Sequence, residues 1–169
     1  MTMTSAKFSQ TVRVLSIASS LTLGSMAVLA QTAAVKVEGA WARATVQGQM
    51  GTGAFMSLTA KEGTTLVGVS TPVAGVAEVH EMKMEGDIMK MRAMPVLDLP
   101  AGKKVDLKPG GYHVMLMDLK APLAKDSTVP MTLLFKDAKG VQSKLELKLP
   151  VSTVAPGTNP GEPPAVHKH

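Results

Sequence analysis

Short runs of alternating apolar and polar residues, broken by Gly, Pro and Asp, fill the chain from Ala34 to Val151. β-Branched residues are frequent in these runs, and turn-forming clusters such as Glu85-Gly86-Asp87 and Pro109-Gly110-Gly111 separate them. No segment repeats its apolar residues with a helical period. The pattern predicts an all-β domain, a Greek-key sandwich of two antiparallel sheets with about eight or nine strands.

The runs themselves give the expected strands. We place them at residues 35–44, 53–59, 64–70, 77–84, 88–93, 104–107, 112–119, 128–135 and 141–149. The chain contains no cysteine, so no disulfide supports this fold and no thiolate is available as a nucleophile or as a metal ligand. Any sulfur ligand must be a methionine.

The two ends differ in composition from the middle. Residues 1–30 begin with the basic Lys7 and Arg13, continue with mostly apolar or small residues and end in small residues before Gln31. This is typical of a cleaved secretory signal peptide and predicts export to the periplasm. A retained membrane anchor is the alternative, but four serines, a threonine and a glycine interrupt the apolar stretch. After cleavage we expect no stable membrane insertion.

The mature protein is expected to comprise a folded domain at 31–151 and a disordered, proline-rich tail at 152–169. Removal of residues 1–30 lowers the formal net charge from +5 to +3. The lysines are spread along the chain, and it has only one Trp, one Tyr and three Phe for stacking on bases. We therefore expect no nucleic-acid partner.

Two histidines and two methionines are the candidate functional residues. Met91 follows His80 after ten intervening residues, His113 follows after twenty-one more, and Met115 stands two residues beyond. Thioether sulfur together with neutral imidazole favours Cu(I), because the reduced ion is the softer one. A blue-copper electron carrier needs a cysteine thiolate, which this chain lacks.

Methionine is also a common core residue, and we expect Met84, Met94 and Met117 to be core residues. The strand at 112–119 argues against extending that interpretation to all methionines. Its apolar face is formed by alternate residues starting at Tyr112, which leaves His113 and Met115 on the other face, exposed or at the rim of the sandwich. Three strands that each supply such groups are an odd way to build a core, but a compact way to build a small metal site at one end of the sandwich.

The spacing of the four residues resembles the His-x10-Met-x21-His-x-Met signature of the periplasmic PCuAC-type copper chaperones. Further segments are similar to that family: Ala40-Trp41-Ala42-Arg43-Ala44-Thr45, Leu99-Pro100-Ala101-Gly102, and the stretch from Leu107 to Leu116. The resemblance covers residues 35–151.

The resemblance implies a cupredoxin-like sandwich that binds one Cu(I) through His80, Met91, His113 and Met115. It also implies delivery of that ion to the copper-site subunit of cytochrome c oxidase or to one of its assembly proteins. Met82, on the same predicted strand face as His80, and Met89 are possible accessory ligands. We expect a monomer, because a transient encounter between donor and acceptor favours one.

The tail ends in His167-Lys168-His169, whose imidazoles suit a second ion in the Cu(II) state. A solvated tail end without a role is the alternative. Since two histidines alone are a weak signal, the sequence leaves both open.

Other function classes fit less well. Met84 stands where a His-Glu-x-x-His zinc protease has its second histidine, and there is no Gly-x-Ser-x-Gly motif and no phosphate-binding glycine loop. We therefore expect that this protein is not an enzyme. An exported, methionine-rich sandwich that stores copper, or that binds a partner protein without delivering metal, remains the alternative function.

Overall fold

The computed structural model describes residues 34–157, which contain ten strands and no helix. Within this stretch nothing helical is long and apolar enough to cross a bilayer. The predicted signal peptide at 1–30 and the tail end with His167 and His169 lie outside the described residues. The strands are β1 (Val35–Arg43), β2 (Gly51–Ala60), β3 (Thr64–Ser70), β4 (Ala74–Glu85), β5 (Ile88–Met94), β6 (Leu97–Leu99), β7 (Lys104–Leu107), β8 (Tyr112–Leu119), β9 (Thr128–Asp137) and β10 (Gln142–Ser152).

The all-β prediction is confirmed, and β3, β7 and β8 have the predicted bounds. The nine strands that the sequence predicts are one fewer than the ten observed, because β6 was missed. β6 has only three residues and pairs at a sheet edge with β3, where Leu97 lies opposite Leu66 and Leu99 opposite Thr64. A run that short has too few residues to show alternation.

The strands follow one another in the hydrogen-bonded order β5-β4-β8-β7-β2-β1-β10-β9-β3-β6, with an additional β8–β2 pairing. Only two residue pairs, beginning at Ala42 opposite Val151, connect β1 to β10, and they run parallel. This narrow connection separates the strands into two groups, β5-β4-β8-β7-β2-β1 and β10-β9-β3-β6. The two groups form the two sheets of a sandwich.

Side chains from both groups meet in one core. In β9 the residues Val129, Met131, Leu133 and Phe135 are buried in strict alternation with more exposed neighbours, as expected for a strand with one face inward. They join residues such as Leu58 of β2 and Leu116 of β8 in a single cluster of buried side chains. Burial of this apolar surface stabilises the sandwich without any disulfide.

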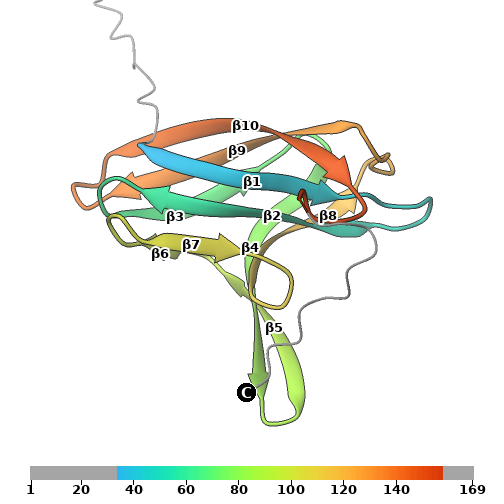
Figure 1. Cartoon of the computed structure of the whole chain (residues 1–169), viewed down its shortest axis with the longest axis horizontal. Helices are drawn as coiled ribbons and strands as arrows, with labels where there is room; N and C mark the ends of the chain where they lie inside the picture. Colours follow the sequence, from blue (N-terminus) through green and yellow to red (C-terminus); the bar gives the residue numbers. More distant parts are fainter. Residues whose placement is uncertain (1–33, 158–169) are drawn as a thin grey trace, which may run out of the picture.

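The β4–β5 hairpin differs from the rest of the fold because it extends beyond the core. Figure 1 shows its two strands projecting away from the sandwich. The register pairs His80 with Ala93 at its base and Glu85 with Ile88 at its tip, where Gly86 takes a positive φ of 63° in the turn. Residues 83–93 are all exposed, so the hairpin is a two-stranded ribbon in solvent.

Candidate metal centre

The two candidate histidines lie directly opposite each other. His80 of β4 pairs with His113 of β8, and because opposed residues in an antiparallel pair share a face, both imidazoles project from the same side of the sheet. Their ring centroids are 5.9 Å apart, with an interplanar angle of 62°. The sequence prediction that these histidines converge is therefore met by the geometry of the sheet.

The candidate methionines are on the same face by the same rule. Met91 of β5 lies opposite Met82 of β4, two residues along from His80. Met115 of β8 lies opposite Glu78 of β4 on one side and opposite Gly53 of β2 on the other. Three strands, β4, β5 and β8, thus present two imidazoles and three thioethers toward one region.

His113 is 5% exposed, which corrects the expectation that its face of β8 lies outward or at the rim. Alternation along β8 predicted one apolar and one exposed face, but β8 is an inner strand that pairs with both β4 and β2. On this second face His113 is buried, whereas Met115 and Met117 are half-buried. His113 is one of two buried polar or charged side chains among residues 34–157, the other being Thr52.

The hydrogen bonds of the two imidazoles assign their protons. The Nδ1 of His113 is 3.0 Å from the carbonyl oxygen of Gly111, which can only accept, so Nδ1–H donates and Nε2 keeps its lone pair. The Nε2 of His80 is 3.2 Å from a carboxylate oxygen of Glu78. By the same argument Nε2–H donates, and Nδ1 keeps its lone pair.

The Nδ1 atom of His80 is buried and has no hydrogen-bond partner. Buried polar side-chain atoms in proteins nearly always have one, so an orphan needs an explanation. A metal ion bonded to this nitrogen provides it. The donor set therefore fits the group that the sequence implies, with Nδ1 of His80 and Nε2 of His113 as the free nitrogens.

A surface cleft of about 420 Å³ lies beside His113, and His80 is not part of its lining. Its lining contains His113 and the three methionines Met82, Met91 and Met115. Glycines of β2 give it room. A Cβ added at Gly53 would stand 2.6 Å from Cζ of Phe55, and one at Gly51 would stand 3.3 Å from Cε of Met115.

The other predicted site residues are distributed as follows. Met89 lies opposite Met84, two register pairs beyond Met82 and Met91 toward the hairpin tip, and is not part of the cleft lining. Met84 is 53% exposed, so its interpretation as a core residue is wrong. Met94 does pack against the core, whereas Met117 is only half-buried.

The side chains that meet in this region suit a soft metal ion. No group of three or more His, Asp or Glu side chains within residues 34–157 is arranged to hold a metal ion. A full coordination shell here needs thioether sulfur, which favours Cu(I). Arg43 also lines the cleft, and its guanidinium is 5.4 Å from the centroid of the Phe55 ring. The positive charge of Arg43 repels a divalent ion more strongly than a monovalent one.

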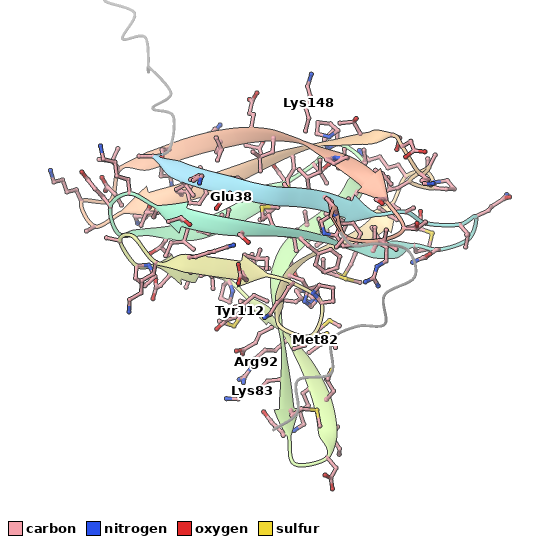
Figure 2. The ribbon with its side chains drawn as sticks, viewed as in Figure 1. Glu38, Met82, Lys83, Arg92, Tyr112 and Lys148 are labelled. Carbon is pink, nitrogen blue, oxygen red and sulfur yellow. The ribbon has the colours of Figure 1, made fainter. Side chains whose placement is uncertain are left out.

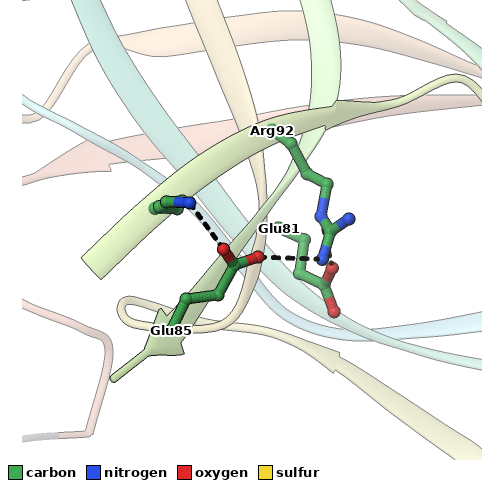
Figure 3. A network of polar contacts seen from close by, with 4 residues as sticks. Glu81, Glu85 and Arg92 are labelled. Atoms are coloured by element: carbon green, nitrogen blue, oxygen red, sulfur yellow. Dashed lines mark hydrogen bonds and ion pairs between the residues drawn. The ribbon is translucent and has the colours of Figure 1, made fainter. Parts of the chain in front are cut away.

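The opposite face of the β4–β5 hairpin is charged. Figure 2 shows Met82 on one side of the hairpin and Lys83 and Arg92 on the other. The Glu85 carboxylate accepts a hydrogen bond from Nζ of Lys90 at 2.6 Å and lies 4.0 Å from the Arg92 guanidinium. The same guanidinium is 3.3 Å from the carboxylate of Glu81 (Figure 3). Burial, followed by the nearby charge of Glu81, raises the pKa of Tyr112, which lies opposite Glu81 on this face.

Sequence reasoning missed Glu78, the carboxylate that orients His80. The signal was present, because a residue two positions before a ligand in a strand shares its face. Gly53 and Phe55 were also missed. Their role depends on how the Phe55 ring lies over Gly53, which no spacing in the sequence shows.

Comparison with solved structures identifies the fold. A copper-bound PCuAC domain from PmoF2 superposes with a TM-score of 0.57 at 22% identity, over 73% of this chain and 97% of that domain. The solution structure of Cu(I)-DR1885 from Deinococcus radiodurans gives a TM-score of 0.56 at 33% identity, over 73% of this chain and 82% of that one. The expectation of a cupredoxin-like Greek-key sandwich is confirmed.

A curated relative, "Putative lipoprotein Lxx21020" of Leifsonia xyli subsp. xyli (strain CTCB07), is 32% identical over 108 residues. The match covers 63% of this chain and 65% of that relative, just under two thirds of its length. The family model described as "Putative lipoprotein LpqE-like" matches residues 35–151, the whole sandwich from the first residue of β1 nearly to the end of β10. The chain therefore belongs to the LpqE-like family, and its fold is that of the PCuAC domains.

Proposed function

We propose that this protein is an exported copper chaperone that carries one Cu(I) ion bound by His80, Met91, His113 and Met115. The observation that carries the proposal is the histidine pair. Two imidazoles stand directly opposite each other with complementary free nitrogens, and the Nδ1 of His80 is buried without a partner. Thioethers from two further positions line the cleft beside them.

The relatives support a copper cargo. Two of the similar structures hold copper, one a copper-bound PCuAC domain and the other DR1885 with Cu(I). DR1885 is 33% identical to this chain. The family description and the curated relative are both of lipoproteins, which supports export. We assign this chain to the periplasm after cleavage of residues 1–30.

A carrier must release its ion, and the four ligands differ in how firmly the fold holds them. His113 is buried, and Met115 lies against Gly51 of β2. Met91 stands on the projecting hairpin and is 50% exposed. An acceptor's ligands can approach from that side and replace the Met91 thioether first, because breaking one neutral, flexible ligand leaves the others in place.

The proposed acceptor is the copper-site subunit of cytochrome c oxidase or one of its assembly proteins. Transfer of Cu(I) between thioether, imidazole and thiolate ligands needs no change in the oxidation state of the ion. His167 and His169 are proposed to hold a second ion as Cu(II).

Copper content after loading tests the proposal. The mature chain is loaded with Cu(I) under reducing conditions, separated from excess metal and compared with a His113→Ala, Met115→Ala double variant. We expect one retained ion in the parent and none in the double variant. A chain truncated after Val154 is the matched control, because it removes the tail histidines and is expected to keep its Cu(I).

Retention of copper alone does not separate a chaperone from a storage protein. A second assay therefore mixes the loaded protein with an apo acceptor domain and follows the appearance of copper in the acceptor. Transfer within the lifetime of an encounter complex supports delivery. Tight binding without transfer would support storage instead.

A further inference from the structure

The methionines of the β4–β5 hairpin form a ladder that extends beyond the proposed Cu(I) site. Met82 lies opposite Met91, and on the next pair of the same face Met84 lies opposite Met89. Directly opposed residues have Cβ atoms about 4.5–5.5 Å apart, and neighbouring pairs lie within reach of long side chains. Four thioethers are therefore adjacent on one face of the ribbon.

Packing does not explain the outer pair. Met84 is 53% exposed and Met89 is 51% exposed, and neither belongs to the core or lines the 420 Å³ cleft. A methionine placed in solvent gains nothing from the flexibility that makes it useful as a core residue. A directly opposed pair of exposed methionines, in line with a second pair, indicates a ligand for sulfur.

The other face of the ribbon keeps the ladder in one orientation. Lys83 and Lys90 lie directly opposite each other, and Glu85 accepts from Lys90. The side chains of Arg92 and Glu81 form a further ion pair on this face (Figure 3). Because the charged groups occupy that face, the thioethers remain together on the other one.

We propose that Met84 and Met89, together with Met82 of the next pair, form a second Cu(I) site built from thioethers alone. Neutral thioether sulfur is a soft ligand that selects Cu(I) over Cu(II) and over zinc, calcium or magnesium. This outer site binds more weakly than the inner one, because it lacks imidazole and is open to water. The inference rests on the proposed function in that the inner site is taken to fill first.

Methionine-methyl NMR on the full chain tests the proposal. The protein is labelled with 13C at the methionine methyl groups and titrated anaerobically with Cu(I). Signals are assigned with single Met→Leu variants, since leucine conserves volume and removes the sulfur. We expect the first equivalent to shift Met91 and Met115, and the second to shift Met84 and Met89.

The Met84→Leu, Met89→Leu double variant is expected to lose the second equivalent and to retain the first. Ile88→Ala is the matched control, because it removes an exposed apolar side chain from the opposite face of the same hairpin. It is expected to retain both equivalents. Loss of the second equivalent in Ile88→Ala would attribute the binding to hairpin structure and would overturn the assignment to thioethers.

Two further outcomes would overturn the outer site. In one, the Met84 and Met89 signals stay unchanged up to two equivalents of Cu(I). In the other, they shift with the first equivalent, together with those of Met91 and Met115. Failure of the proposed function has a different signature. In that case the first equivalent leaves Met91 and Met115 unmoved, whereas the response of Met84 and Met89 can still be measured.

Discussion

Replacement of Glu78 by glutamine is the change that isolates the role of the carboxylate beside His80. A carboxylate can only accept, so it holds the proton of His80 on Nε2 and leaves Nδ1 free for the metal. A glutamine amide can also donate to Nε2. The opposite tautomer then becomes available, with the proton on Nδ1, and that proton blocks the coordinating lone pair.

The expected loss follows from the geometry. Removal of a partner that orients a metal-binding histidine costs about 10- to 100-fold in metal affinity. The Glu78 side chain is 48% exposed and its carboxylate is 3.2 Å from Nε2 of His80, so water competes for the imidazole. The loss of affinity therefore belongs at the lower end of that range. We expect Cu(I) affinity to fall about tenfold, which corresponds to about 1.4 kcal/mol.

Competition titration against a Cu(I) chelator measures this change under reducing conditions. Glu85→Gln is the matched control, because Glu85 is also half-exposed and on β4 but faces the charged side of the hairpin. It is expected to leave the affinity unchanged. Equal affinities for Glu78→Gln and the parent protein would refute the assignment of the His80 tautomer.

Three further changes have defined outcomes. Gly53→Ala places a methyl 2.6 Å from Cζ of Phe55 and should lower the free energy of unfolding in urea by about 1–3 kcal/mol. Gly68→Ala is the control and should lower it less, because its Cβ would be 3.7 Å from its nearest neighbour. Equal losses would argue against a tight cleft wall. Phe135→Ala empties a fully buried position in β9 and should lower the unfolding free energy by about 3–5 kcal/mol, and a loss under 1 kcal/mol would place Phe135 outside the core. Met91→Ala should weaken Cu(I) binding and change transfer kinetics, and unchanged affinity together with unchanged transfer would remove Met91 from the site.

The sequence predicted the strands well because alternation and turn residues are local signals. β3, β7 and β8 have the predicted bounds, and the candidate ligands could be proposed because their spacing is a pattern along the chain. Residues two positions apart in a strand lie on the same face, and this rule correctly placed Met82 with His80.

The burial of His113 and the exposure of Met84 could not be predicted in this way, because both depend on which strands are neighbours. His113 is buried since β8 lies between β4 and β2, whereas Met84 is exposed since the β4–β5 hairpin continues past the core. Strand order and the length of an overhanging hairpin are set by tertiary pairing. The ring of Phe55 over Gly53 is likewise a packing detail without a local signal.

X-ray absorption spectroscopy at the copper edge tests the central claim most directly, on the mature chain loaded with one equivalent of Cu(I). A reduced edge with imidazole nitrogen and thioether sulfur in the first coordination shell, and loss of the imidazole nitrogen from the His113→Ala, Met115→Ala double variant, is the predicted result. A shell of oxygen and nitrogen without sulfur, or a spectrum that the double variant leaves unchanged, would contradict it.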